Sequence, residues 1–260
     1  AATKLSSEDV KLDGLADISR SLEGRAAGVS VQNVSGTFGT APKIRVRGAT
    51  SIYGSSKPLW VVDGIIMEDV TEVSADELSS GDAVTLISSA IAGLNANDIE
   101  SFQILKDGSA TSIYGARAAN GVVVITSKRG LAMDKAKVTL RGQWGFSQLA
   151  SNDNWMMMNT PERIQFEKEI GQDTGKDYNL LSRTNINWLD EVFNDRAPLQ
   201  SYELSVNRAT DRLNYYVSGG FYDQDGIAQS STFRRYNMRA NAEVKASNWL
   251  KIGTNTMMAY

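Results

Sequence analysis

The pattern of polar and apolar positions changes near Gly130, and this change divides the chain into two halves. Before Gly130, short apolar runs are separated by clusters of Gly, Ser and Asn, which is typical of mixed α and β structure. After Gly130, long segments alternate between polar and apolar residues with the period of two that a β-strand requires. The sequence therefore predicts two architectures in one chain.

The first half is predicted to form a small sheet with helices packed against it. Residues Asp13 to Ala27 carry apolar side chains at helical spacing, namely Leu15, Ile18, Leu22 and Ala26, and Gly28 is a natural stop for that helix. A short helix is expected over Ser109 to Ala119. The strand-like runs are Val29 to Gln32, Lys43 to Arg47, Leu59 to Asp63, Glu100 to Lys106 and Val122 to Ser127.

The second half is predicted to contain five antiparallel strands. In Lys137 to Ser147 the apolar residues Val138, Leu140, Trp144 and Phe146 share one face. The other four strands are expected near 202–207, 213–222, 235–245 and 250–260. Their connections alternate between short ones, at 209–211 and 247–248, and long ones, at 148–200 and 223–232. Outer-membrane barrels show this alternation, with short periplasmic turns and longer outside loops.

A soluble β-sandwich is the alternative interpretation, because its strands have the same period. Three features favour strands that cross a membrane. The fourth strand carries many charges on its polar face, which suits a wet lumen, and strands of ~9–11 residues cross a bilayer when tilted. Aromatic residues also stand near several strand ends, where interfacial girdles form: Trp144, Phe146, Tyr202, Phe221, Trp249 and Tyr260.

Composition removes many other functions. The chain has neither Cys nor His, which excludes disulfides, thiol nucleophiles, zinc sites with N or S ligands and His-based triads. A formal net charge of -3 gives no field for gathering nucleic acid. No apolar run approaches the ~18–20 residues of a membrane helix. We expect a protein that is not an enzyme and uses no cofactor or metal.

Seven motifs resemble the plug of the SusC/RagA-type TonB-dependent outer-membrane transporters, in order and in spacing. They are Leu22 to Val29, Lys43 to Gly48, Pro58 to Gly64, Leu94 to Ser101, Ile104 to Asp107, Ile113 to Val122 and Ile125 to Gly130. Parts of the second half are similar to the family's early barrel strands, so the resemblance extends over about residues 13–260. The departures are Gly108, where the family usually has Ala, and an insert from Val70 to Ala92.

The resemblance implies an α+β plug domain followed by antiparallel transmembrane β-barrel strands that belong to a plugged barrel of 22 strands. The domains would be a leader segment at 1–12, the plug at 13–130, and the first five barrel strands at 131–260, with a long extracellular loop at about 148–200. The resemblance also implies import of a large nutrient, an oligosaccharide or an oligopeptide, across the outer membrane of a Gram-negative bacterium. TonB would supply the energy and a SusD-like surface lipoprotein would act as the lid. A secreted or surface β-rich binding or adhesion module is the alternative.

Chain length conflicts with a complete barrel. A wall of that size needs on the order of 220 residues at ~10 per strand, and only residues 131–260 follow Gly130. We therefore expect this chain to be a piece of a longer protein.

Candidate site residues follow from the predicted arrangement. Four cations are candidates for ion pairs between plug and barrel, with pairing inside the plug as the alternative for each: Arg45, Arg47, Lys106 and Arg117. Substrate-facing candidates on the plug loops are Ser51, Tyr53, Ser55, Ser56, Lys57, Met67 and Glu68. Asp63, before Gly64, is interpreted as the cap of a turn. In the long loop a helix is expected from Thr160 to about Glu169. The residues before it either contact the lipoprotein or are buried in the loop itself: Trp155, Met156, Met157 and Met158.

Overall fold

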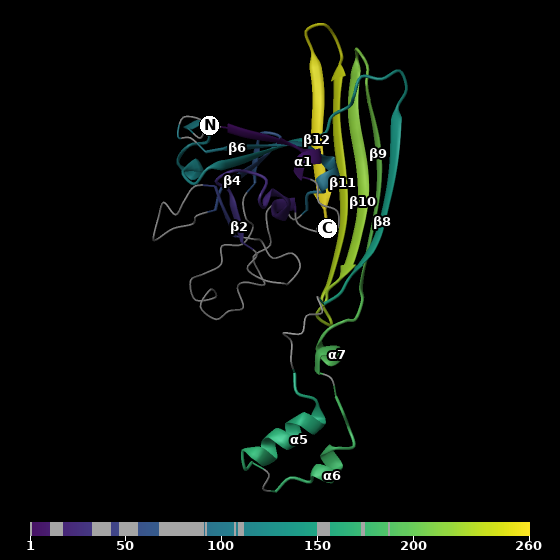
Figure 1. Ribbon diagram of the computed structural model, residues 1–260. Coiled ribbons are helices and arrows are strands. Elements are labelled where there is room, and N and C mark those ends of the chain that lie inside the picture. Colours follow the sequence, from purple (N-terminus) through teal and green to yellow (C-terminus); the bar gives the residue numbers. More distant parts are fainter. Residues whose placement is uncertain are drawn as a thin grey trace.

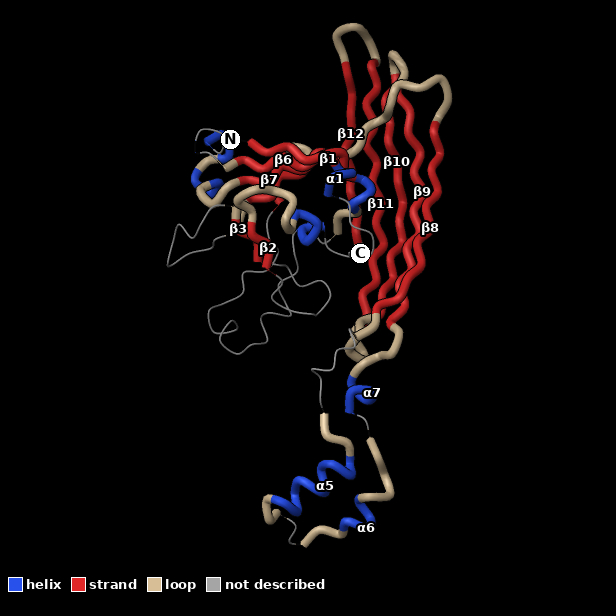
Figure 2. The backbone as a smooth tube through the Cα atoms, in the orientation of Figure 1, coloured by secondary structure: helices blue, strands red, loops and turns tan. Residues whose placement is uncertain are grey.

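The computed structural model has an N-terminal domain that lies against one face of a long C-terminal sheet (Figure 1). It describes residues 2–10, 18–32, 43–46, 57–67, 91, 93–106, 108, 112–149, 157–172, 175–186 and 188–260. In Figure 2 the strands of the C-terminal sheet run roughly across those of the N-terminal domain. The two predicted architectures are therefore two layers that face each other.

The N-terminal domain is built on a five-stranded sheet of order β1-β6-β7-β4-β5. Strand β4 runs parallel to β7, and the other neighbours are antiparallel. The strands are β1 (Ala2–Ser6), β4 (Leu59–Val62), β5 (Ile65–Met67), β6 (Ile99–Leu105) and β7 (Val122–Ser127), and a separate pair is formed by β2 (Ser30–Gln32) and β3 (Lys43–Arg45). The segment expected as a leader at 1–12 thus contributes an edge strand, β1, and the short helix α1 (Ser7–Val10).

In the described residues of the two helices expected in this domain, the helical segments are 3-10 turns and end earlier than the sequence predicts. In the expected helix at 13–27, the described residues 18–27 form the 3-10 helix η1 (Ile18–Leu22) followed by turns, and residues 11–17 lie outside the described part. Gly24 and Gly28 have φ of 68° and 73°, so the chain turns instead of continuing a helix. The described part of the expected helix at 109–119 consists of two 3-10 turns, η3 (Ser112–Tyr114) and η4 (Ala116–Ala118).

Apolar residues from the N-terminal sheet and the segments around it form the core of this domain. Ile18, Leu22 and Ala26, which the sequence places on one helical face, are all buried. They pack with buried strand residues in one cluster: Val31, Ile44, Val62, Ile99, Phe102, Ile104, Val123 and Ile125. The spacing of apolar residues therefore identified the buried side correctly, although the helix is short.

The C-terminal sheet is an antiparallel meander of order β8-β9-β10-β11-β12. Its strands are β8 (Lys137–Ser147), β9 (Ala197–Ala209), β10 (Leu213–Asp225), β11 (Thr232–Lys245) and β12 (Lys251–Ala259). The prediction of five strands is confirmed, and β8 has the predicted bounds. The connection expected to be long at 223–232 is only residues 226–231, because β10 and β11 continue further than the alternation indicated.

The C-terminal sheet is built inside out compared with a soluble domain. Leu140, Trp144 and Val138 are exposed by 77%, 69% and 63% on one face, whereas the other face, on the side of the N-terminal domain, has many buried polar residues. These buried polar residues are Glu203, Ser205, Asn207, Ser218, Arg235, Asn237, Arg239 and Asn241. A sheet in water buries its apolar face. The exposed apolar face of this sheet, which we call the outer face, is therefore suited to an apolar environment.

The connection between β8 and β9 carries the remaining helices, α5 (Thr160–Glu169), α6 (Tyr178–Leu181) and α7 (Trp188–Val192), beyond the end of the sheet (Figure 1). Helix α5 begins where the sequence predicts, with Pro161 in its first turn. Asn159 and Glu162 form a capping box there, each side chain accepting a backbone N–H of the other residue.

Within this connection, Glu167 accepts hydrogen bonds from Lys176 and Arg163 at 2.7 and 2.9 Å, and these bonds lower the pKa of Glu167 to about 2. Among the described residues, none of the helices is long and apolar enough to cross a membrane.

Candidate functional site

The candidate site is the interface between the N-terminal domain and the polar face of the C-terminal sheet. Among the described residues, two groups of side chains make most of the hydrogen bonds of this contact. One group surrounds Asp63 and meets β11 and β12, and the other surrounds η2 (Ala96–Asp98) and meets β8 to β11. Because the sheet presents hydrogen-bonding groups here, the geometry of these groups determines how the domain is held.

Asp63 is positioned by a two-residue hairpin turn. Strands β4 and β5 pair at Val62 and Ile65, and the two residues between them, Asp63 and Gly64, both have positive φ, of 50° and 88°. Two positive φ values are the pattern of a type I′ turn, for which Asp-Gly is a preferred sequence. Asp63 is therefore a turn residue, as expected, but the interpretation that it only caps the turn is wrong, because its carboxylate bonds to Ser127 and to the C-terminal sheet.

The Asp63 carboxylate is shared by both layers. Its Oδ1 accepts the backbone N–H of Ser127 at 2.8 Å. Its Oδ2 accepts from Ser127 Oγ at 2.6 Å, Arg239 Nη1 at 2.9 Å and Asn255 Nδ2 at 2.9 Å. The side chains of Asp63 and Arg239 are only 4% and 2% exposed. This is a buried ion pair with further hydrogen bonds, the arrangement in which such a pair is best compensated for lost hydration.

These contacts set the charge state of Asp63. Burial raises the pKa of the Asp63 carboxyl, but the hydrogen bonds from Asn255, Ser127 and Arg239 together outweigh burial and hold the pKa below its ordinary value of 3.8. A depressed pKa in the assembled state means that assembly is favoured above the ordinary pKa and loses this contribution as the pH falls. Asp63 is thus a fixed negative charge at neutral pH.

Asn241 extends the Asp63 group to the end of β7. Asn241 Nδ2 donates to Ser127 Oγ at 2.8 Å and to the Lys128 carbonyl at 2.9 Å. We call the set Asp63, Ser127, Arg239, Asn241 and Asn255 the Asp63 cluster. It joins a turn and a strand end of the N-terminal domain to two strands of the C-terminal sheet.

The second group is the segment from Leu94 to Asp98, in which every polar side chain contacts the C-terminal sheet. Asn95 donates to Glu203 at 3.3 Å, and Asn97 accepts from Arg141 at 2.7 Å. Asp98 Oδ1 accepts from the hydroxyls of Tyr216 and Ser218 at 2.9 and 2.5 Å. In addition, Arg235 donates to the Leu94 carbonyl at 3.2 Å.

Close approach between the layers also depends on two glycines. A Cβ at Gly93 would lie 2.6 Å from Cβ of Ala259 on β12, and a Cβ at Gly130 would lie 2.1 Å from the Arg208 carbonyl oxygen on β9. Both distances are shorter than any real carbon contact. Glycine is thus required at these positions for the layers to meet.

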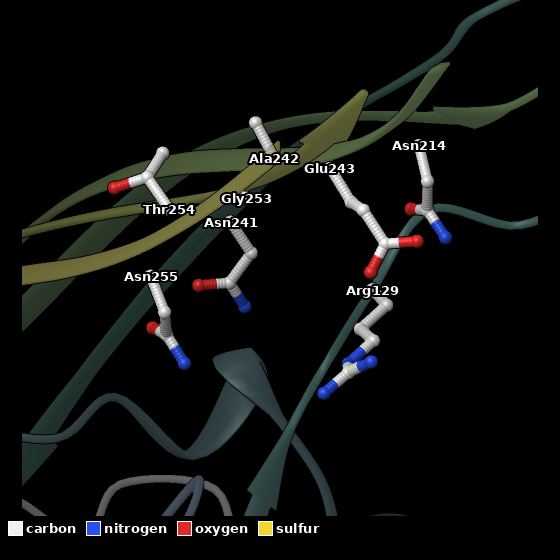
Figure 3. A pocket seen from close by; sticks show the side chains of 8 residues that line it. All are labelled: Arg129, Asn214, Asn241, Ala242, Glu243, Gly253, Thr254 and Asn255. Carbon is white, nitrogen blue, oxygen red and sulfur yellow. The ribbon is translucent and has the colours of Figure 1, made fainter. Parts of the chain in front are cut away.

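A partly open pocket of about 230 Å³ lies beside the Asp63 cluster (Figure 3). Arg129, Asn214, Asn241, Glu243 and Asn255 point to the same side in this view, whereas Ala242 and Thr254 point to the other. Gly253 completes the lining. The side chains that enter the pocket are thus all polar.

The four cations proposed for interlayer ion pairs have different surroundings. Lys106 Nζ donates to Thr3 Oγ1 at 3.3 Å and to the Ala27 carbonyl, both within the N-terminal domain. Arg45 lies in β3 with its Nε buried and without a hydrogen-bond partner among the described residues, and Arg117 lies exposed in η4. Arg47 lies outside the described residues. Their pairing with the C-terminal sheet stays a prediction.

The proposed substrate contacts fall largely outside the described part of the chain. Ser51, Tyr53, Ser55, Ser56 and Glu68 belong to the undescribed residues, whereas Lys57 is exposed and Met67 is half-buried at the end of β5. Their role as substrate contacts is therefore still a prediction. Met157 and Met158 are 52% and 48% exposed, and Trp155 and Met156 are not described.

Sequence reasoning missed most of the residues that make the interface. Arg239 and Asn241 appear in the alternation as the polar face of a strand, and Asn95 to Asp98 as part of a motif. The signal in the sequence was a long strand with many charged and amide side chains on one face. If that face is not in bulk water, these side chains need hydrogen-bond partners in the protein. The alternation predicts which residues share this face, but it does not predict which residues they contact.

Comparison with known proteins agrees with this architecture. Residues 1–122 match the family model of the TonB-dependent receptor plug domain. The TonB-dependent receptor P26 of Formosa agariphila is 31% identical over 264 aligned residues, which cover all of this chain and 25% of that protein. The TonB-dependent receptor SusC of Bacteroides thetaiotaomicron is 32% identical over 221 residues, covering 85% of this chain and 20% of that protein. The structure of the RagAB peptide transporter matches with a TM-score of 0.81 and 30% identity, over all of this chain and 30% of the other.

The fold and the interface define a plug domain held by barrel strands, and the chain spans about a quarter of the length of the first relative. The particular kind follows from matches that extend over all or most of this chain: it consists of a plug and early barrel strands of the SusC/RagA-type TonB-dependent transporters. The N-terminal domain is called the plug from here on, and the C-terminal sheet is called the wall.

Proposed function

We propose that this chain provides the plug and part of the wall of a transporter that imports a large polar nutrient, an oligosaccharide or an oligopeptide, across the outer membrane. TonB is the proposed energy source and a SusD-like lipoprotein is the proposed partner outside. The relatives support this, since one is named for SusC and another is a peptide transporter. In this proposal the strands β8 to β12 are one section of a wide, plugged barrel.

The observation that carries the proposal is the inside-out packing of the wall. A polar solute needs a polar lumen, and an apolar outer face needs lipid. The wall has both, because Arg239 and Asn241 are buried toward the plug while Leu140 and Trp144 are exposed on the other side. A soluble sandwich would bury the second face.

The outer face also has an aromatic belt at one level. Tyr202, Phe221 and Tyr236 are direct neighbours in register, with ring centroids 6.4 and 5.0 Å apart, and Trp144 Nε1 donates to the Tyr202 hydroxyl at 2.9 Å. Trp249, 84% exposed, lies in the turn at the far end of the sheet. Aromatic residues at both ends of an apolar band are typical of barrels in membranes. This supports an outer-membrane location.

The plug attachments suit a plug that must be released. Apart from Met257 of β12, which packs against the core of the plug, the attachments described above are hydrogen bonds or ion pairs, so water can replace each of them at a modest net cost. Separating two apolar surfaces would instead expose both of them to water, and no new hydrogen bonds would compensate for that cost. We propose that force transmitted by TonB breaks the Asp63 and η2 contacts and opens a path along the wall.

The loop with α5 to α7 is the proposed contact with the lipoprotein. It extends beyond the end of the wall opposite the short turns (Figure 1). Exposed apolar side chains on it, including Met157, Met158, Ile170 and Leu180, offer a surface for a protein partner.

Growth of the source bacterium tests the proposal. A strain that lacks the gene is expected to lose growth on one complex glycan or peptide source, to recover it with the gene restored, and to require TonB for recovery. Loss of growth that does not depend on TonB would favour a surface adhesion or binding module instead.

Location is tested separately with spin labels, since the chain contains no Cys of its own. Labels at the outward residues Leu140 and Val217 are expected to collide with oxygen dissolved in lipid, and a label at the inward residue Ser218 is expected not to. A water-accessible label at Leu140 in the native envelope would contradict a membrane wall.

A further inference from the structure

Three cations occupy neighbouring positions at the short-turn end of the wall. Lys245 and Lys251 are direct partners in the register of β11 and β12, and the Lys245 backbone N–H donates to the Arg212 carbonyl at 2.8 Å. We call Arg212, Lys245 and Lys251 the cation row. Because neighbouring strands lie about 4.8 Å apart, the row places three positive charges side by side across the ends of β10, β11 and β12.

The charge of the cation row is only partly compensated within the described part of the chain. Lys251 Nζ lies 3.4 Å from the Glu243 carboxylate, but no ion pair connects Arg212 or Lys245 to another described residue. The three cations are exposed, and they lie together although the chain has a formal net charge of -3. Like charges at opposite strand positions repel each other. An anion that binds to the row relieves this repulsion.

The cation row belongs to the inward face of the wall. Lys245 lies four residues after Asn241, which is buried on the side of the plug, and a strand returns to the same face at every second residue. Val244 and Ile252 belong to the apolar outer face and are 43% and 58% exposed. A lipid headgroup would approach from that outer side, whereas a solute that moves along the inner face would pass the row.

Further cations lie on the inward side near the same end of the wall. Lys137, which is exposed, begins β8 opposite the buried inward residue Asn207. Arg129, which follows β7 of the plug, enters the pocket beside Glu243 (Figure 3). An excess of one charge sign along a cleft raises the local concentration of solutes of the opposite sign. This end of the wall is therefore suited to attract anions.

We propose that the cation row is a binding site for an anionic nutrient at the point where the nutrient leaves the wall. The ligand is an oligomer with carboxylate or sulfate groups on successive units, so that more than one of its charges meets the row. An oligosaccharide and an oligopeptide can both carry such groups. The inference rests on the proposed import function and deepens it, because it names the charge class of the nutrient.

Binding to the purified full-length protein tests the site, since the exposed row is open to solution while the plug is in place. The probes are fluorescent tetragalacturonate and tetraglutamate, with neutral tetragalactose as the reference. The variant Arg212→Gln/Lys245→Gln is expected to bind at least one of the two anions about tenfold more weakly at low ionic strength, with no change for tetragalactose. The difference is expected to disappear in 1 M salt, where the Debye length is about 3 Å.

The two anions distinguish the possible sources of the charge. Loss of affinity for tetragalacturonate alone would support an acidic glycan, and loss for tetraglutamate alone would support an acidic peptide. Loss for both would support recognition of repeated charge whatever the backbone. If the double variant does not assemble, the single variants Arg212→Gln and Lys245→Gln are each expected to give part of the loss.

Arg183→Gln/Arg196→Gln is the matched control. It removes the same charge from two exposed positions, one in the loop after α6 and one before β9 at the opposite end of the wall. This variant is expected to bind both anions like the unmodified protein. An equal loss in both double variants, or no loss in the row variant, would overturn the proposal. Weaker binding of phosphatidylglycerol micelles without any loss for the two oligomers would assign the row to lipid and would overturn it as well.

The outcome is separate from that of the proposed import function. The binding measurement needs no TonB, so a negative result would leave import of a neutral nutrient as it stands. Growth that does not depend on TonB would refute import even if the cation row bound the anions.

Discussion

Asp63 in the plug and Arg239 in the wall are 176 residues apart in the sequence, yet the carboxylate Oδ2 lies 2.9 Å from the guanidinium Nη1. Both side chains are almost fully buried. The pair connects a hairpin turn of the plug with the middle of β11, so it ties the position of the plug to one strand of the wall.

Removing the charge of Asp63 is expected to weaken plug attachment. Asn in place of Asp63 tolerates the positive φ of the turn and has nearly the same shape, so Asp63→Asn changes mainly the charge. Arg239 then lacks its carboxylate, and the expected loss is about 3–5 kcal/mol, as for other buried pairs that lose one partner. The urea concentration at which protease cleaves the plug measures the loss.

Asp211→Asn is the control for this prediction, since Asp211 is exposed in the turn between β9 and β10. It is expected to leave the urea midpoint unchanged. Equal shifts in both variants would mean that the ion pair contributes nothing specific.

Two adjacent tyrosines on β10 provide a matched test of the η2 contact. Tyr216 is buried and donates to Asp98, whereas Tyr215 lies on the opposite face of the same strand. Tyr216→Phe is expected to destabilise plug attachment by roughly 1–2 kcal/mol, because the Asp98 carboxylate loses one of its donors. Tyr215→Phe is expected to have no effect in the same urea assay, and an effect of similar size would contradict the assigned contact.

Close approach at Gly93 is expected to be sterically strict. Gly93→Ala places a methyl group 2.6 Å from Cβ of Ala259, so the segment before η2 must move away from β12. Plug cleavage by protease should then occur at lower urea concentration. Adding Ala259→Gly removes the clash and is expected to restore most of the loss, while Gly108→Ala, with nothing within 4 Å, serves as the control.

Acid is expected to loosen the contact between α5 and α6. The pKa of Glu167 is about 2 in the folded loop, below its ordinary value of 4.5. A depressed pKa means that the ion pairs with Lys176 and Arg163 stabilise the loop fully above about pH 4.5 and are lost as the pH falls toward 2. A spin label at Gln172 is expected to become more mobile over this interval.

Glu167→Gln is the reference for this effect. In this variant the spin label at Gln172 is expected to be more mobile at neutral pH than in the unmodified protein, and its mobility is expected to change little on acidification. A pH-dependent increase in mobility that persists in Glu167→Gln would assign the change to another group.

Local chemistry made several elements predictable from residues alone. Strict alternation gave β8 its bounds, the Asp63-Gly64 pair indicated a turn, and Asn159 with Glu162 caps the helix that begins at Thr160. Each of these depends on residues within a few positions of one another. The helix predicted at 13–27 ends earlier than expected, at Leu22, because Gly24 adopts a positive φ, whereas Gly28 has the positive φ expected of a stop.

The sequence by itself determined which residues share a face and that one face of the wall is apolar, because a strand alternates its side chains whatever surrounds it. Only the tertiary structure decided which partner each polar residue meets. Asp63 reaches Arg239, and Asp98 reaches Tyr216, through the docking of two sheets whose relative position no local pattern specifies. An ion pair or a hydrogen bond requires that its two groups lie close together in space, and it is the docking of the two layers that brings these groups together.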